Sequence, residues 1–197
     1  MNLLSLLKLS FAFFLIIGFL TNCKKNMLLT DQDFATKWAE MTLFITKNTP
    51  SNSPTYSSRC LGYIGLTMYE SIVNSDSTYQ TLSGQLDGLD SLPKPEKGQK
   101  YDYKLALNAA QATILKSIYN QTSDQNKLKI DSLENFILEN YSEKIKDKSL
   151  INRSVAYGKA VAVVIFEWSK TDGGYRGYLK NFDKKMVYPN RLGSWKP

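Results

Sequence analysis

Apolar side chains recur every three or four residues in five separate stretches of the chain, which is the spacing of one face of an α-helix. The stretches cover about 31–47, 55–74, 102–119, 123–142, where Ser123 is the expected N-cap, and 147–169. We therefore expect an all-α fold, a bundle of about five helices without a substantial sheet. The predicted core contains Ile64, Met68, Leu133, Ile137, Val163 and Phe166.

Two of these predicted helices have a composition that bears on packing. The second contains Gly62 and Gly65, and each glycine inside a helix costs up to about 1 kcal/mol relative to alanine. We therefore expect another helix to pack closely at these positions. The last stretch is apolar or small nearly all round after Val155, which predicts the central, buried helix of the bundle.

Polar segments separate and follow the helices. The connection 74–100 is rich in Ser, Gly, Asp, Pro and Lys and is long for a compact domain. It is expected to lie on the surface, held there by Leu82, Leu86, Leu89 and Leu92. The tail 171–197 is rich in glycine and aromatic residues without a helical period. It is predicted to be a loop-rich tail, which assigns the helical domain to residues 31–170.

The first 22 residues have the pattern of a secretory signal. One cation, Lys8, precedes the apolar run LSFAFFLIIGFL at 9–20, and a charged start before a short apolar core is typical of such signals. The run is shorter than the roughly 20 apolar residues that a membrane-spanning helix needs. The alternatives are an ordinary cleaved signal and an uncleaved helix flanked by Lys24 and Lys25.

The segment Leu20-Thr21-Asn22-Cys23 follows this run and resembles the lipobox of bacterial lipoproteins. In that family the signal is removed before the cysteine, which then carries fatty chains. Two chains suffice for stable anchoring, since each buried methylene contributes about 0.8 kcal/mol. The resemblance implies a signal peptide at 1–22, a lipidated Cys23 and a tether at 23–30. The chain would be exported and anchored to membrane lipid of the bacterial cell envelope, at the outer membrane or the periplasmic face.

Charge and residue usage exclude several function classes. The formal net charge is +7, and +6 without residues 1–22, which carry only Lys8. The cations are interleaved with acids and form no basic stripe with aromatics, so nucleic-acid binding is not expected. The chain contains no histidine, which excludes histidine bases, histidine metal ligands and Ser-His-Asp triads built from this chain alone. No metal site is predicted. Cys60, in a helix with small neighbours, is predicted to be a buried, unreactive thiol.

Charged residues in two predicted helices leave two interpretations open. The second helix carries Arg59, Tyr63 and Glu70, and the last carries Glu167. They can form a carboxylate pair or an Arg–Glu site facing a cavity of the bundle. The alternative is a set of surface or inter-helix ion pairs, which are common and contribute little.

The turn Thr171-Asp172-Gly173-Gly174 follows the last helix. Its two glycines allow a backbone to approach a ligand closely, but the preferred interpretation is a plain helix end followed by a turn. Weak candidates for contact with an anion or another ligand are Arg59, Asp172 and Arg176. No catalytic residue is assigned.

Three segments also carry a resemblance: 38–74 (WAEMTLFITKNTPSNSPTYSSRCLGYIGLTMYESIVN), 101–119 (YDYKLALNAAQATILKSIY) and 153–182 (RSVAYGKAVAVVIFEWSKTDGGYRGYLKNF). In this order they resemble the N-terminal region of vanadium-dependent haloperoxidase-like proteins from Bacteroidetes. Those proteins belong to the superfamily that includes type 2 phosphatidic acid phosphatases. The resemblance covers nearly the whole chain after residue 22.

The resemblance implies a helical bundle around an oxyanion site for vanadate or phosphate. The family's site residues lie in a lysine and Arg-Pro motif, a Pro-Ser-Gly-His segment and a Ser-Arg…His segment, whose histidine binds vanadium or attacks phosphate. None of these motifs occurs in this chain. No catalytic residue is therefore carried over, and vanadate is not expected to be bound by this chain alone.

Two functions remain open at this point. The chain can be the non-catalytic, N-terminal helical half of such an enzyme, which would associate with the missing C-terminal half or form an oligomer. Alternatively, it is a stand-alone helical lipoprotein of the cell envelope with a binding or structural role.

Overall fold

The computed structural model describes residues 31–180, 187, 189 and 191–194, which belong to one compact unit, Asp31–Pro197. The described residues form five α-helices and no strand, so the all-α prediction is confirmed. The helices are α2 (Asp31–Asn48), α3 (Pro54–Ile72), α4 (Tyr103–Ile118), α5 (Asp124–Ser142) and α6 (Lys148–Trp168). Three 3-10 turns complete the fold: η1 (Val73–Ser75), η2 (Ser169–Asp172) and η3 (Gly177–Leu179).

Polar caps fix where four of the helices begin. Ser53 and Ser123 accept backbone N–H groups from the first turns of α3 and α5, and Asp102 and Asp147 do the same for α4 and α6. Each cap satisfies donors that have no partner inside the helix. The predicted N-cap at Ser123 is confirmed.

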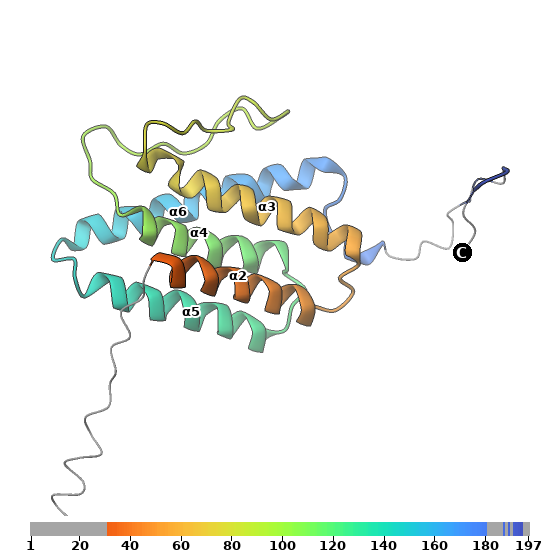
Figure 1. The fold of residues 1–197 in the computed structure, drawn as a ribbon, viewed down its shortest axis with the longest axis horizontal. Helices are drawn as coiled ribbons and strands as arrows, with labels where there is room; N and C mark the ends of the chain where they lie inside the picture. The colour runs from red at the N-terminus through yellow and green to blue at the C-terminus, as the bar shows by residue number, and fades with distance from the viewer. Residues whose placement is uncertain (1–30, 181–186, 188, 190, 195–197) are drawn as a thin grey trace, which may run out of the picture. The chain divides into compact units, whose positions relative to one another are not determined.

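The central helix of the bundle is α4. In Figure 1 it lies between α3 and α2, with α6 behind it and α5 beyond α2. Its residues from Leu105 to Ala112 are all buried, including the polar side chains Asn108 and Gln111. The prediction that residues 147–169 form the central helix is therefore wrong. One side of α6 faces outward, and its Val163 is 49% exposed.

The helix glycines show where close packing occurs and where it does not. A Cβ atom at Gly158 of α6 would lie 1.9 Å from the carbonyl oxygen of Ala106 in α4, so the two backbones touch at this crossing. A Cβ atom at Gly62 or Gly65 of α3 would meet nothing within 4 Å. The expected close approach to the α3 glycines is absent from the described part of the chain, and Gly158 has that role instead.

The predicted core is right in part. Ile64 and Ile137 are buried, Met68, Leu133 and Phe166 are half-buried, and Val163 is exposed. The largest fully buried side chain is Trp38 of α2. Its indole N–H donates to Asn108 Oδ1 at 3.1 Å, and the Asn108 amide donates to the Glu134 carbonyl of α5 at 2.9 Å. This chain of hydrogen bonds joins α2, α4 and α5.

The long connection before α4 is attached to the bundle at its leucines, as expected. Leu89 and Leu92 are buried against α6, while Leu82 and Leu86 are half-buried. Glu70 at the end of α3 is also buried, and its carboxylate accepts the Thr81 hydroxyl and the Leu82 N–H, both at 2.7 Å. A buried carboxylate thus fixes the start of this connection.

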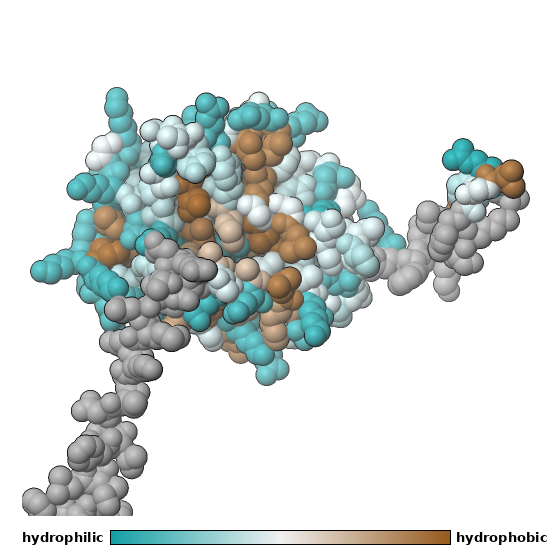
Figure 2. Space-filling view, in the orientation of Figure 1, coloured by the Kyte–Doolittle hydropathy of each residue, from teal (hydrophilic) through white to brown (hydrophobic). Residues whose placement is uncertain are grey.

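The face shown in Figure 2 is largely polar, and its apolar side chains lie in several places. Some are near the middle of this face, and others are near its top and its left edge. One described segment, Lys148–Asp172, is long and apolar enough to cross a membrane by length and composition alone. Its helix α6 packs against α3 and α4, as core helices of bundles do.

Candidate functional site

The structure brings two of the predicted candidate residues, Arg59 and Asp172, into direct contact. Arg59 and Tyr63 are one turn apart on α3, so they point in the same direction. Asp172 ends η2, which continues directly from α6. We call Arg59, Tyr63, Asp172 and Gly174 the Arg59 cluster.

Asp172 is the centre of this cluster. One carboxylate oxygen accepts from Arg59 Nε at 2.6 Å and from the Tyr63 hydroxyl at 2.9 Å. The other accepts from Arg59 Nη2 at 3.0 Å and from the Gly174 N–H at 2.7 Å. Arg59 Nη2 also donates to the Ser169 carbonyl. The two-pronged Arg–carboxylate pair is the strongest geometry for such a contact.

The two glycines of the turn have different roles. Gly173 has a φ of 77°, a left-handed conformation that ends η2 and that glycine adopts without strain. A Cβ atom at Gly174 would lie 2.5 Å from Arg59 Nε, so a larger residue here would force the Arg59 side chain to shift. The backbone of this turn lies close to the side chain of Arg59, and the turn follows a helix end, which is the interpretation that the sequence favours.

Aromatic rings enclose the guanidinium of Arg59. Its central carbon lies 4.9 Å from the centroid of the Tyr63 ring and 5.9 Å from that of Tyr56. Tyr63 in turn meets Trp168 edge to face, with centroids 5.4 Å apart. A groove of about 360 Å³ lies beside the cluster and is also lined by Ser58, Gly62, Leu66, Leu86 and Trp168.

These contacts shift the pKa values of Asp172 and Tyr63. Burial alone would raise the pKa of Asp172, but the hydrogen bonds from Arg59, Gly174 and Tyr63 lower it below the usual value. Burial, together with the neighbouring carboxylate, raises the pKa of Tyr63 to about 12. Asp172 already accepts four hydrogen bonds, which uses the acceptor sites of a carboxylate. It is therefore poorly suited to act as a base, and its negative charge opposes the binding of an anion at Arg59.

Asp172→Asn is expected to lower the free energy of unfolding by about 1–2 kcal/mol near neutral pH, since hydrogen bonds to a charged group are lost. The folded pKa is lowered, so this stabilisation is present above the unfolded value of roughly 4 and disappears as pH falls through the folded value. Urea unfolding at a series of pH values measures it. The wild type and Asp172→Asn should converge in acid. Asp90→Asn is the control, because Asp90 is exposed. An equal loss of stability in Asp90→Asn would contradict the stabilising role given to the hydrogen bonds of Asp172.

The other predicted candidates lie apart from this cluster. Glu70 is bound to the connection after α3, and Glu167 pairs with Lys170 on the surface at 2.5 Å. Arg176 is exposed, and its guanidinium lies 5.4 Å from the Tyr175 ring centroid. Of the two interpretations of the charged helix residues, the structure favours ion pairs and hydrogen bonds. Asp172, 113 residues after Arg59, is the partner that sequence spacing does not indicate.

The prediction for Cys60 can be compared with the structure, whereas the prediction for Cys23 cannot. Cys60 is fully buried, as predicted, and burial raises the pKa of its thiol to about 11. The protonated thiol is the unreactive form. Cys23, the predicted lipidation site, lies outside the described residues.

Residues 22–185 match the family model described as the vanadium chloroperoxidase N-terminal domain. The chain belongs to this family. A similar solved structure is that of the first bacterial vanadium-dependent iodoperoxidase, with 25% sequence identity and a TM-score of 0.64. The match covers 84% of this chain and 37% of that one. A comparison with curated proteins gives no match. The predicted resemblance to the N-terminal region of haloperoxidase-like proteins is confirmed.

In the described part of this vanadium chloroperoxidase N-terminal domain, three cations are engaged by carboxylates of the same chain. An oxyanion such as vanadate requires several donors that converge on one point. Here Arg59 is bound by Asp172, Lys116 by Asp131 and Glu134, and Arg153 by Asp147. Among the described residues no group of three or more Cys, Asp or Glu side chains is arranged to hold a metal ion.

Proposed function

We propose that this chain is a membrane-anchored lipoprotein that supplies the N-terminal, non-catalytic helical half of a vanadium haloperoxidase- or phosphatase-like enzyme. The main support is the family match, because the matched model describes an N-terminal domain. In the similar iodoperoxidase the match covers only 37% of the chain. The family's vanadate would be bound by residues of the catalytic, C-terminal half.

The charge arrangement of the described helices agrees with this proposal. Arg59 and Asp172 neutralise each other and tie the end of α6 to α3, which is a structural task. The sequence has no histidine, the residue type that binds vanadium or attacks phosphate in the family. Loss of even one preorganised donor typically lowers the rate of such a centre by about 100- to 1,000-fold.

The purified chain without residues 1–22 is expected to show no turnover. The assays are bromination of monochlorodimedone with vanadate and peroxide, and hydrolysis of p-nitrophenyl phosphate. A vanadium haloperoxidase that oxidises bromide serves as the positive control for the first assay. Turnover above the buffer blank that survives repurification would contradict the proposal. Weak vanadate binding alone would not, because surface cations attract anions without catalysing their reactions.

Lipid anchoring at Cys23 is tested separately in cells. Cys23→Ala is expected to retain residues 1–22, which intact-mass measurement detects, and to lose incorporation of labelled palmitate. Cys60→Ala is the matched control, because Cys60 is buried in the helical domain and should leave processing and labelling unchanged. Normal cleavage of Cys23→Ala and its release from the membrane fraction would instead indicate an ordinary signal peptide.

A further inference from the structure

Exposed lysines gather at the end of the bundle where α2 and α6 begin. They lie in the connection before α4, between α5 and α6, and at the first residue of α6: Lys97, Lys100, Lys144, Lys146 and Lys148. We call this set the basic end. None of the five is paired with an acid in the described part of the chain. The helix α6 runs from the basic end to the Arg59 cluster, so the two surfaces are separate.

Contacts between side chains hold the lysine-bearing segments together. Arg153 Nε, in the first turns of α6, donates to the Lys100 carbonyl at 2.6 Å. This bond fixes the end of the long connection against α6. Lys144 lines a hollow together with Tyr101 and Tyr103, so the residues after α5 lie beside the start of α4. The lysines therefore belong to one surface, although they come from three segments.

The chain enters the bundle at the same end. Phe34, in the first turn of α2, meets Tyr141 near the end of α5 edge to face, with ring centroids 5.8 Å apart. The start of α2 is thus close to the segment that carries Lys144. Cys23 precedes Asp31, the first residue of α2, by eight positions. Such a stretch spans at most about 29 Å when fully extended.

Positive charge prevails at the basic end. Asp102 and Asp147 are the N-caps of α4 and α6, and Asp147 also pairs with Arg153 at 3.5 Å. Glu96 and Glu143 are the exposed acids nearest to the lysines in sequence, so the lysines outnumber them. The acids and lysines of residues 24–33 are equal in number: Asp31, Asp33, Lys24 and Lys25.

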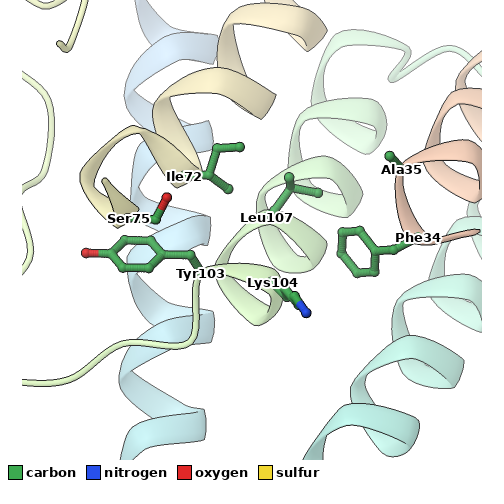
Figure 3. A pocket seen from close by; sticks show the side chains of 7 residues that line it. All are labelled: Phe34, Ala35, Ile72, Ser75, Tyr103, Lys104 and Leu107. Carbon is green, nitrogen blue, oxygen red and sulfur yellow. The ribbon is translucent and has the colours of Figure 1, made fainter. Parts of the chain in front are cut away.

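Tyrosine and apolar side chains lie beside the lysines. Figure 3 shows a hollow of about 310 Å³ at this end, with Phe34 of α2 facing Ile72 of α3 across Leu107 of α4. The Tyr103 hydroxyl points away from Phe34 and Leu107 in this view, and both Tyr103 and Tyr101 are half-buried. An apolar ring with a polar tip is suited to the boundary between membrane and water. The basic end thus combines cations with side chains of this kind.

We propose that the basic end lies on the membrane surface, where its lysines contact the phosphate groups of anionic lipids. The orientation rests on the lipid anchor at Cys23 of the proposed function, since that anchor keeps the start of α2 near the lipid. Each basic residue close to an anionic membrane strengthens binding by roughly fivefold. The attraction fades within a Debye length, about 10 Å at 0.1 M salt, so it acts on the end next to the tether. The Arg59 cluster, at the far end of α6, is then held away from the lipid.

Sedimentation with vesicles measures the attraction without the anchor. The vesicles contain phosphatidylcholine alone or with about one-third of the anionic lipid phosphatidylglycerol. The protein is the chain without residues 1–22, whose described helices belong to one unit, Asp31–Pro197. It should bind the anionic vesicles at least about tenfold more tightly, and about 0.5 M salt should remove the difference. Equal binding to both kinds of vesicle would overturn the proposal, whereas lipid anchoring itself is decided by Cys23→Ala in cells.

Two triple variants test whether the contact is at the basic end. Lys144→Gln, Lys146→Gln and Lys148→Gln together should weaken binding to anionic vesicles by at least about tenfold. The matched control changes three exposed lysines elsewhere on the bundle: Lys47→Gln, Lys159→Gln and Lys180→Gln. It should lose less than about threefold, because these positions lie beyond the reach of the membrane charge. Both variants have the same net charge, so equal losses would overturn the proposal. Urea unfolding checks that both are folded.

A pair of labelled positions on one helix reports the orientation. Gln125 is the second residue of α5 and Glu143 follows its last residue, and both are exposed. Glu143→Cys and Gln125→Cys are made in a chain that begins at Lys24, where Cys60 is buried and resists labelling. On anionic vesicles, a quencher attached to the lipid headgroups should dim a dye at position 143 more than one at position 125. Equal quenching, or stronger quenching at position 125, would overturn the proposal.

Discussion

Gly158→Ala is expected to be among the most damaging single substitutions in this chain, lowering the free energy of unfolding by about 3 kcal/mol or preventing folding. The added Cβ would lie 1.9 Å from the Ala106 carbonyl oxygen and 2.6 Å from its carbonyl carbon. Both are backbone atoms of the central helix, so no side chain can rotate away. The helices α4 and α6 would have to separate, which would also disturb Val161 and Ile165. Urea unfolding followed by circular dichroism measures the loss.

Gly65→Ala is the matched control for this prediction. It makes the same chemical change in the middle of another helix, where the added Cβ meets nothing within 4 Å. Because alanine is the better helix former, Gly65→Ala should stabilise the chain by up to about 1 kcal/mol. The two substitutions are thus predicted to have opposite signs. Equal stabilities of Gly158→Ala and the wild type would show that α4 and α6 are not in backbone contact.

The contrast between these glycines also shows what the sequence can predict. Hydrophobic periodicity locates all five helices, because each has one apolar face, whatever it packs against. It does not identify the partner of that face. Gly62, Gly65 and Gly158 look alike in sequence, yet only Gly158 lies at a helix crossing. The position of a helix crossing depends on how all the helices of the bundle pack together, which a local sequence pattern does not specify.

The wrong prediction that α6 is the central helix has a related cause. Helix α4 contains Asn108 and Gln111, which make it look less apolar than α6, although both residues are buried. Burial of their side chains is possible because Trp38 and the Ile64 carbonyl provide hydrogen-bond partners from α2 and α3. Such partners are far apart in sequence, so a polar residue in a periodic stretch is easily taken for a surface position.

The sequence predicts members of the candidate site but not their arrangement. It points to Arg59 on a helix and to Asp172 in a glycine-rich turn. Their pairing depends on how α6 lies along α3, which no local pattern specifies. The local signal for a contact is Gly173-Gly174, since two adjacent glycines indicate a close backbone approach. The sequence could not show that the contact is with Arg59 of the same chain.

Trp38→Ala is expected to lower the free energy of unfolding by about 3–5 kcal/mol, the range for truncating a large buried side chain. Trp38 is fully buried, and its loss leaves a cavity between α2 and α4 and removes the donor to Asn108 Oδ1. Chemical unfolding monitored by circular dichroism is the measurement. Trp38→Phe keeps most of the volume and should cost less, and its remaining effect reports on the hydrogen bond and the smaller ring.

Trp168→Ala is the matched comparison for Trp38→Ala. Trp168 is only half-buried, and its indole N–H donates to the Asp87 carbonyl in an exposed position at 3.1 Å. Water can replace that partner and fill the space, so the loss should be clearly smaller than for Trp38→Ala. The two tryptophans are equally apolar in the sequence, and the difference arises from burial alone. If Trp168→Ala destabilises the chain as much as Trp38→Ala, the connection before α4 contributes as much to stability as the packing of α2.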